Sequence, residues 1–450
     1  MPGLTPGIPN PPFASEKTDF APRFGVAFRP QPGIVMRGGY GIFYDTAGYK
    51  YLDQMFFNSP GYGGSEYDSP TYSALNGQDP NVPYFTLGNT FPTAVTLQKG
   101  EWPIPLGTLG GILAPQGDTT TIDKDTSKTP YLQYWNLQLE KELGKVAVFS
   151  VGYVGSKGTR LPRPYDLNLP PQGVYLNSQD YFNARPLSAQ YPNRFGAVNA
   201  VHHDLNNNYN AMEVEFRSRS WHNLVVISNY AWSKQLDIFY GTSAEAGINV
   251  IGGQWHPEWS YGPSDANHTH HFVASATYSI PFLQTGNRLM RSTLGGWQLN
   301  AISTFESGSP FTIFNGSTSS FDYMGDVPLR TCNGNLPRSQ RTFLRALNTS
   351  CFTDPAAGPD GIAVSRGNAA RNIITGPGIS NWDMSAVKSI SLAGERSLQF
   401  RVEAFNALNH PQWSTVNGTD DTLTNQQSTF GYITASRPPR LLQLSGRFDF

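Results

Sequence analysis

The sequence predicts an all-β fold built from antiparallel strands. Its 450 residues include about eleven segments in which apolar and polar side chains alternate, and this period of two is typical of a strand with one apolar face. The segments between them come in two sizes, short and long. Charged residues make up only 14% of the chain and aromatic residues 13%, which favours a surface in contact with something less polar than water.

The predicted strands form hairpins followed by one terminal strand. Short polar or glycine-containing segments separate the two strands of most pairs, as turn residues do. In chain order, the predicted strands are Phe20–Arg29, Ile34–Asp45, Tyr131–Glu140, Val146–Gly155, Asn210–Arg219, Leu224–Lys234, His271–Phe282, Gly296–Glu306, Ile379–Ile390, Ser397–Leu408 and Leu441–Phe450.

Connections within hairpins are short, and connections between hairpins are long. Short turns such as KELGK (141–145) and SLAGER (391–396) join the strands of a hairpin, whereas long segments such as Thr46–Pro130 and Phe314–Gly378 join successive hairpins. Outer-membrane barrels have short periplasmic turns and long extracellular loops. The pattern therefore predicts an antiparallel transmembrane β-barrel whose last strand runs toward the periplasm.

Charge and hydropathy exclude other classes of protein. The net charge of −1 creates no strong field, so we predict no nucleic-acid partner. Mean hydropathy is −0.38, and no apolar run reaches the length of a transmembrane helix. If the chain crosses a membrane it does so with strands, because only helices and closed barrels satisfy their backbone groups in lipid.

The chain divides into a linker at 1–19 and a barrel at 20–450. The opening stretch MPGLTPGIPNPPF is rich in proline and glycine, and it lacks the basic and apolar regions of a secretory signal. We therefore expect the chain to be a fragment, either the later part of a longer exported protein or the product of a gene model that lost its beginning.

Several strands separate charged residues from apolar ones. Met212, Val214 and Phe216 alternate with charged side chains, and so do Phe400 and Val402. In a barrel, the apolar set faces lipid and the charged set faces the lumen, where opposite charges pair across strands. The residues predicted to face the lumen are Glu213, Glu215, Arg217, Arg401, Glu403 and Arg447.

The last predicted strand, LLQLSGRFDF, ends on aromatic residues. Leu442, Leu444, Phe448 and Phe450 fall on one face, and the length suits a tilted strand that crosses a bilayer. Chain termini usually fray into water, so an aromatic end is unusual for a soluble protein.

The two cysteines, Cys332 and Cys351, lie in one polar segment. They are a possible disulfide in an oxidising compartment, or two reduced thiols. Closing a loop of this size would stabilise the fold by roughly 3 kcal/mol.

No motif predicts catalysis or a cofactor. The histidines of NHTHH (267–271), with His202, Asp204 and His256, are potential metal ligands, but a polar rim at a strand end explains them more simply. The DKD of residues 123–125 lacks the glycine and terminal glutamate of a calcium loop. The glycines of RGGYGIF are not followed by the lysine and helix of a phosphate-binding loop. We therefore predict that the protein is not an enzyme and has no catalytic residues, no cofactor and no metal site.

A set of segments resembles a known family. They are FAPRFGVAFRP, VMRGGYGIFYD, YNAMEVEFRSRS, NYAWSKQLD, HFVASATYSIPF, GWQLNAISTFESGSPFT, NIITGPGISNWDMSAVKSI, LQFRVEAFNALNHPQW and FGYITASRPPRLLQLSGRFDF. In order and spacing they resemble the carboxy-terminal barrel of TonB-dependent outer-membrane transporters of Gram-negative bacteria, and most closely the Oar-like group. The resemblance covers nearly the whole chain from about Asp19.

The resemblance implies a barrel of 22 strands that encloses a plug, of which this chain holds about eleven, the carboxy-terminal half. It also implies transport of an unidentified solute across the outer membrane, and contact with the TonB complex through a plug region that we do not find in this sequence. Outer-membrane barrels commonly end on an aromatic residue that the barrel-assembly machinery recognises, so the resemblance assigns an assembly signal to Phe448 and Phe450.

Two other functions remain open at this stage. One is a structural or adhesive outer-membrane surface protein whose long loops contact cells or matrix. The other is a soluble all-β enzyme or binding protein. A plug upstream in the reading frame would distinguish the transporter from the adhesive protein, and membrane fractionation would distinguish both from the soluble protein.

Overall fold

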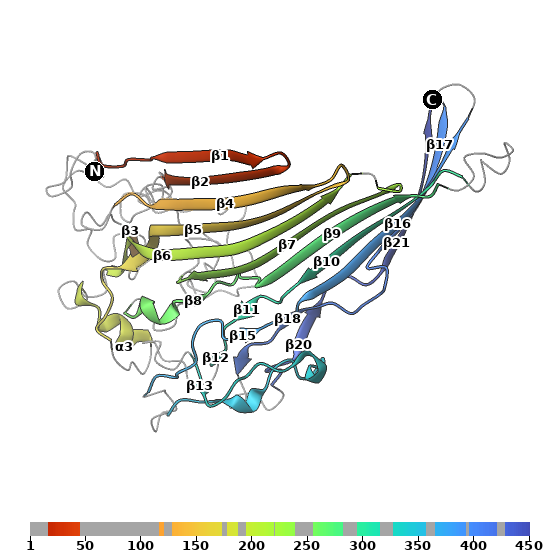
Figure 1. Cartoon of the computed structure of the whole chain (residues 1–450). Helices are drawn as coiled ribbons and strands as arrows, with labels where there is room; N and C mark the ends of the chain where they lie inside the picture. The colour runs from red at the N-terminus through yellow and green to blue at the C-terminus, as the bar shows by residue number, and fades with distance from the viewer. Residues whose placement is uncertain are drawn as a thin grey trace, which may run out of the picture.

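One large sheet dominates the chain in a computed structural model (Figure 1). The structure describes residues 17–45, 117–120, 128–172, 178–187, 195–219, 221–238, 255–281, 295–315, 327–356, 365–392, 396–420 and 428–450. The predicted linker is therefore described only from residue 17 onward.

Eleven strands follow one another along the sheet, each hydrogen-bonded to the next. They are β1 (Arg23–Gln31), β2 (Ile34–Tyr44), β4 (Tyr131–Leu143), β5 (Ala147–Asp166), β6 (Phe195–Ser218), β7 (Leu224–Asp237), β9 (His270–Ser279), β10 (Trp297–Glu306), β16 (Ile379–Ser391), β17 (Ser397–Phe405) and β21 (Leu441–Asp449). Two short strands pair at the side of this path, β3 (Gly117–Thr120) with β6 and β8 (Gly262–Pro263) with β7. Each predicted strand corresponds to one of the eleven, so the all-β antiparallel fold class is confirmed.

Two strands are longer than the sequence predicted. Beyond Gly158, β5 and β6 continue to pair through a register shift, and Arg160 adopts a positive φ of 59° at this point. The extension contains Pro162 and Pro164, residues that normally argue against a strand in the middle of a sheet. The bulge and the two prolines explain why the predicted strand stopped at Gly155.

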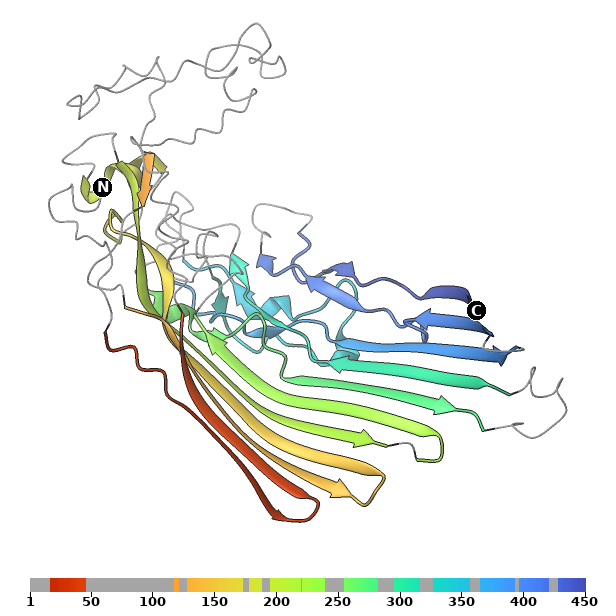
Figure 2. The same cartoon turned by 90° about the horizontal axis from the view of Figure 1, so that it is seen from above.

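The two ends of the sheet differ in their connections. Neighbouring strands along the path are antiparallel. The β1–β2, β4–β5 and β6–β7 turns consequently lie at one end (Figure 2). Gly33 and Gly144 lie in two of these turns with φ of 81° and 60°, a conformation that glycine adopts without steric cost. The strand ends that lead into the long connections lie at the opposite end, as the loop lengths predicted.

The described sheet is open, and its edge strands are β1 and β21. An even number of antiparallel steps separates these two strands, so they run in the same direction. Closure into a barrel and a total of 22 strands therefore remain predictions.

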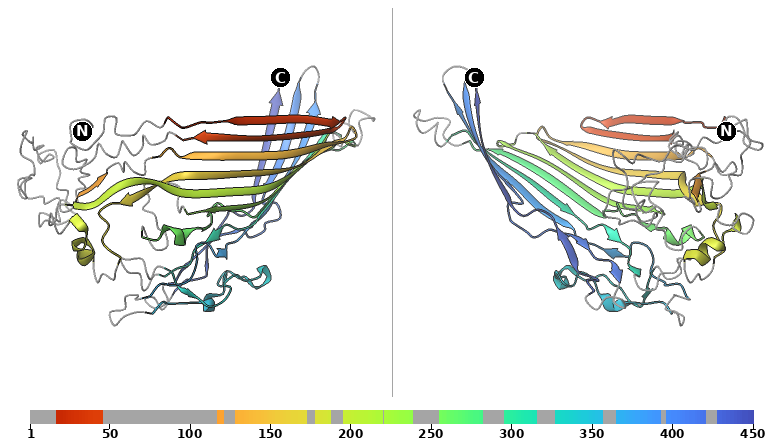
Figure 3. Two further views of the ribbon diagram at one scale, coloured as in Figure 1. Left: turned by 60° about the vertical axis from the view of Figure 1, so that its left-hand side comes forward. Right: turned by 180° about the vertical axis from the view of Figure 1, so that it is seen from behind.

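A second unit, which we call the loop cap, gathers at the long-connection end beside β10, β16 and β17 (Figure 3). It comprises the described residues of 255–269, 307–378 and 406–440. Pairs of short strands hold it together: β11 (Pro310–Phe311) with β15 (Ile374–Thr375), β12 (Phe314–Asn315) with β19 (Thr419–Asp420), β13 (Leu329–Arg330) with β14 (Phe352–Thr353), and β18 (Trp413–Val416) with β20 (Ile433–Ser436).

The loop cap has a hydrophobic core of its own. Ile313 and Leu347 are fully buried, and they pack with Ile374, Phe352 and Phe430. A smaller cluster is formed by Val327 and Ala369, with Trp259 packed against them. Segments that the sequence analysis treated only as loops are thus folded against one another.

Helical structure is limited to short segments in the part of the chain that the structure describes. They include α3 (Ser178–Asn183) and the 3-10 turns η1 (Pro257–Ser260), η2 (Arg338–Gln340) and η3 (Thr349–Cys351). None of the described helices has the length and apolar character needed to span a membrane.

Candidate functional site

One face of the sheet is polar. The strand register places the predicted charged residues of β6, β17 and β21 on the same face, as their alternation indicated. These residues are Glu213, Glu215, Arg217, Arg401, Glu403 and Arg447. Thr277, Asn300 and Ser385 continue this face across β9, β10 and β16, joined by side-chain hydrogen bonds of 3.1 and 3.0 Å.

Ion pairs on the polar face join side chains of opposite sign. Arg37 Nη1 on β2 lies 3.1 Å from Glu140 Oε2 on β4. Within single strands, Arg217 pairs with Glu215 at 3.0 Å and Arg401 with Glu403 at 3.6 Å. These pairs are solvent-accessible, so each contributes at most about 1 kcal/mol to stability. They make the face hydrophilic without leaving it strongly charged.

A hollow of about 530 Å³ lies in the middle of the polar face. Its lining includes charged and polar groups from Arg37, Gln138, Glu213 and Glu215. Gly152, which has no side chain, also lines the hollow. This hollow holds water or polar groups more readily than apolar ones.

The opposite face is apolar and exposed. Leu139, Met212, Leu299 and Phe400 lie on it, and Leu444 on β21 is 78% exposed. Large apolar side chains in such numbers do not remain in contact with water on a stable soluble protein. This face requires a cover of comparable apolarity.

A buried arginine fastens the loop cap to the sheet. Arg371 is 2% exposed, and its guanidinium pairs with Asp237, the last residue of β7, and with Asp265 at 3.2 Å. The next residue, Asn372, donates hydrogen bonds to Asp265 Oδ1 at 2.6 Å and to the Pro263 carbonyl at 2.7 Å. This clamp joins the connection after β10 to the connection after β7.

Sequence reasoning missed the clamp. Its members are 134 residues apart at the extreme, so no local spacing connects them. The one available signal was a charged residue, Arg371, inside the otherwise uncharged stretch NAARNIITGPG of a chain poor in charge.

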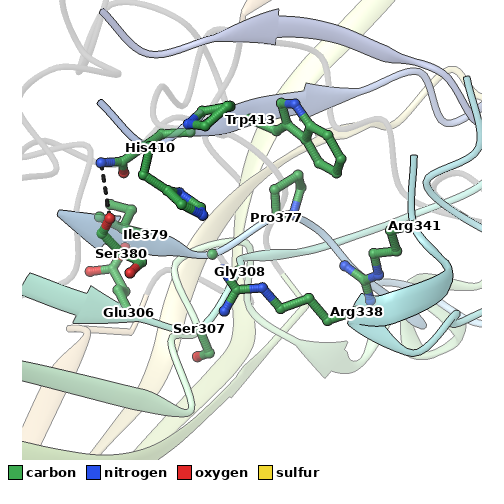
Figure 4. Close-up of a pocket in the computed structure, with 13 residues that line it drawn as sticks. Glu306, Ser307, Gly308, Arg338, Arg341, Pro377, Ile379, Ser380, His410 and Trp413 are labelled. Carbon is green, nitrogen blue, oxygen red and sulfur yellow. Dashed lines mark hydrogen bonds between the residues drawn. The ribbon is translucent and has the colours of Figure 1, made fainter. Parts of the chain in front are cut away.

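A cavity of about 450 Å³ lies where the loop cap meets the ends of β10 and β16. Figure 4 shows the side chains of Arg338, Arg341, His410 and Trp413 around it, contributed by two separate segments of the cap. Glu306, at the end of β10, lies on the other side. The cavity therefore combines two cations with aromatic and apolar surfaces.

Comparison with protein-family models identifies the family of the chain. A family model described as an outer membrane beta barrel domain matches residues 2–443. The chain belongs to this family. Its location is therefore the outer membrane.

Solved structures of outer-membrane proteins are similar to this barrel-family chain at low identity. The outer membrane transporter YddB from Escherichia coli has a TM-score of 0.46 and 9% identity, over 92% of this chain and 38% of that one. The siderophore receptor PiuA from Acinetobacter baumannii has a TM-score of 0.40 and 8% identity, over 95% and 35%. The FrpB iron transporter from Neisseria meningitidis has a TM-score of 0.38 and 11% identity, over 95% and 38%.

This chain thus spans less than two fifths of the length of these transporters. A search of curated protein sequences finds no significant match.

The histidines of this barrel-family chain bind protein groups. His268 Nδ1 lies 3.3 Å and His271 Nε2 lies 3.5 Å from the carboxylate of Glu306, and His270 hydrogen-bonds the Tyr230 hydroxyl. In the described residues, no group of three or more histidine, cysteine or acidic side chains is arranged to hold a metal ion. His202 stacks on Tyr165, and Asp204 pairs with Arg163 at 2.7 Å. His256 stacks on Trp259. The DKD of residues 123–125 lies outside the described residues.

The cysteines and the terminal aromatics lie at opposite ends of the barrel-family sheet. Cys332 and Cys351 form a disulfide inside the loop cap, where Cys351 is fully buried against its core. Phe448, on β21, and Phe450, just after it, stack with ring centroids 6.1 Å apart. Phe450 is 96% exposed, so the described residues do not bury this side chain.

Proposed function

We propose that the chain is the carboxy-terminal half of the barrel of an outer-membrane TonB-dependent transporter that takes up a solute not yet identified. The observation that carries the proposal is the two-faced sheet of eleven strands with its connections sorted by length between its two ends. The finer assignment to the Oar-like group rests on the resemblance of the quoted segments.

In this proposal, the polar face lines the lumen. Glu213, Glu215, Arg217, Arg401, Glu403 and Arg447 would then surround the solute path, and the apolar face would contact outer-membrane lipid. The hollow beside Arg37 and Glu213 supports this view, because a transport lumen needs space and hydrogen-bonding groups along its wall.

The odd number of strands in the sheet limits what can complete the barrel. Because β1 and β21 run in the same direction, two copies of this sheet placed edge to edge in the same membrane orientation would meet in parallel pairs at both seams. An antiparallel closure needs a partner segment with an odd number of strands. We therefore propose that further strands of the same protein close the barrel to which residues 20–450 belong. A plug that contacts the TonB complex would then fill this barrel.

The orientation follows from the loop lengths and has a direct test. We propose that the loop cap is extracellular and that the β4–β5 turn at Gly144 is periplasmic. An epitope tag after Leu344, at a cap turn, should label intact cells, whereas a tag after Gly144 should label only after the outer membrane is permeabilised. Equal labelling of the two tags on intact cells would reverse or refute this topology.

Transport is tested by the solutes that cells leave behind. In the parent bacterium, deleting the gene and deleting TonB should leave the same solute unconsumed in a complex medium, measured by mass spectrometry of the spent medium. Re-expression of the full-length protein should restore consumption in the first strain only. If the strain without the gene consumes every solute as the wild type does, the transport proposal fails.

An adhesive surface protein remains the alternative, and one observation favours it. Phe343 and Leu344, at a turn of the loop cap, are 57% and 60% exposed. Exposed apolar side chains at the tip of a loop suit contact with another surface. If this role is correct, replacing both residues with serine should reduce adhesion between cells while the amount of barrel stays unchanged.

A further inference from the structure

The cavity at the base of the loop cap has a wall suited to one kind of ligand. We propose that it binds an organic anion, whose carboxylate is held by Arg338 and Arg341 and whose body packs against Trp413 and His410. The inference rests on the proposed transport function and deepens it, because it names the chemical class of the solute.

The two arginines supply positive charge that no carboxylate among the described residues neutralises. Arg341 donates to the carbonyl oxygens of Leu336 at 2.9 Å and Gly376 at 3.1 Å. Within the described residues, neither Arg341 nor Arg338 forms an ion pair, whereas Arg163, Arg185 and Arg371 all do. A guanidinium offers five donors in a planar fork that matches a carboxylate, so such a pair of arginines is suited to capture one.

Burial makes the lack of an acidic partner costly for Arg341. Arg341 is partly buried, and desolvation lowers its pKa from the ordinary value for arginine. Arginine nevertheless remains charged at neutral pH, and its hydrogen bonds to the Leu336 and Gly376 carbonyls offset only part of the cost of removing this charge from water. A bound carboxylate would supply it.

The acidic side chain of the wall does not compete for the arginines. Glu306 is the one acidic residue among those that line the cavity, and its carboxylate lies against His268 and His271, at 3.3 and 3.5 Å. In Figure 4, Arg338 extends toward Gly308, and Arg341 lies on the opposite side of the view from Glu306. The arginines and Glu306 thus occupy different parts of the wall.

The remaining wall includes flat apolar surfaces. Trp413, Pro377 and Pro411 provide surfaces on which a ring or short hydrocarbon body can pack. The neighbouring Gln412 is anchored by hydrogen bonds from its Nε2 to the Ser380 carbonyl at 3.2 Å and to Asn381 Oδ1 at 3.0 Å. This anchoring ties the segment that carries His410 and Trp413 to β16, so part of the wall is formed before any ligand arrives.

The test uses 2-naphthoate as the probe and its neutral analogue 2-naphthamide as the matched ligand. Binding of each to the full-length protein, purified from outer membranes in detergent, is measured by isothermal titration calorimetry. Naphthoate should bind and naphthamide should bind about 10- to 100-fold more weakly, because it lacks the charge-assisted hydrogen bonds. Equal binding of the two would overturn the assignment of an anion site.

Variants then locate the site. Arg338→Gln and Arg341→Gln should each weaken naphthoate binding by about tenfold or more, whereas Arg345→Gln, an exposed cap arginine away from the cavity, should not. Arg338 is exposed, so its replacement tests the site even if Arg341→Gln disturbs the cap. Unchanged affinity in Arg338→Gln and Arg341→Gln would overturn the proposal, and so would displacement of naphthoate by equimolar inorganic phosphate.

This experiment is independent of transport. If naphthoate fails to bind but solute consumption still depends on TonB, the anion site is wrong and the transport function stands. If naphthoate binds as described but deletion of the gene leaves no solute unconsumed, the site stands and the transport function is wrong.

Discussion

The sheet and the loop cap use apolar side chains in opposite ways. In the cap, Ile313 and Leu347 are fully buried against other apolar residues, as in any water-soluble domain. In the sheet, Phe400 is 49% exposed and Leu444 is 78% exposed. The cap buries its own apolar surface, whereas the described residues leave one apolar face of the sheet without a cover.

Charged residues show the converse difference. Arg371 in the cap is almost completely buried and pairs with Asp237 and Asp265. The pairs on the polar face of the sheet, such as Arg37 with Glu140, remain accessible to water. Removing one partner of a buried pair is costly because it leaves the other charge desolvated, whereas an exposed pair contributes little. The same type of substitution should therefore have very different effects in the two regions.

The largest effect is expected from Arg371→Ala. It leaves the buried carboxylate of Asp237 without its partner and should destabilise the loop cap by up to about 5 kcal/mol. Hydrogen exchange of the cap amides should accelerate, most of all in residues 365–378, while the amides of β4 and β5 stay protected. The matched control is Arg437→Ala, which removes an exposed arginine of the same cap.

If Arg371→Ala accelerated hydrogen exchange in β4 and β5 as much as in the cap, the claim that the two regions are stabilised separately would be refuted. The two regions would then unfold as one cooperative unit.

The next effect concerns the faces of the sheet. Val214 lies on the apolar face and Glu213 on the polar face. An arginine on the lipid side costs up to about 4 kcal/mol near the middle of the membrane and less toward its edges. Val214→Arg should therefore reduce the amount of assembled barrel, measured as heat-modifiable protein in outer membranes, far more than Glu213→Arg does. Equal assembly of the two variants would refute the assignment of the faces.

The disulfide should matter for the loop cap alone. Cys332 and Cys351 are 19 positions apart, and closing a loop of this size stabilises by about 3 kcal/mol in the chain-entropy model. Replacing both with serine should increase protease cleavage in residues 327–356. The fraction of heat-modifiable barrel should stay as in the wild type. A loss of barrel with no change in cap cleavage would show that the disulfide stabilises the sheet instead.

The sheet was predictable from sequence because its rules are local. A period of two, as in Leu398, Phe400 and Val402, determines which face a side chain occupies, and strands that follow one another along the chain pair with each other in the sheet. Prediction failed where a local rule was broken. Pro162 and Pro164 are paired within β5 beyond a bulge, where a sequence reading stops the strand.

The loop cap was not predictable in the same way, because its contacts join distant segments. Arg371 meets Asp237 across 134 residues, and Trp413 meets the arginines of the cavity from a different connection. Neither arrangement has a fixed spacing in the sequence. A single charged residue in an uncharged loop was the available sign of the clamp, and its partner could not be read from the chain.

The smallest change in stability is expected at the end of β21, where the sheet differs most from the cap. Phe450 is 96% exposed and its ring contacts Phe448, so Phe450→Ala removes little packing and should change the stability of the assembled protein by less than about 1 kcal/mol. We nevertheless expect less protein in the outer membrane, because we propose that the barrel-assembly machinery binds these two aromatic side chains before the sheet is covered by lipid. Leu408→Ala is the control, since Leu408 is also an exposed apolar residue, 62% exposed, and lies shortly after the end of β17. Heat-modifiable protein and its thermal midpoint are measured for the full-length wild type and both variants. The proposal requires Phe450→Ala to lower the amount without lowering the midpoint. A normal amount would remove the assembly role, and a lowered midpoint with a proportionate loss would make Phe450 an ordinary stabilising contact.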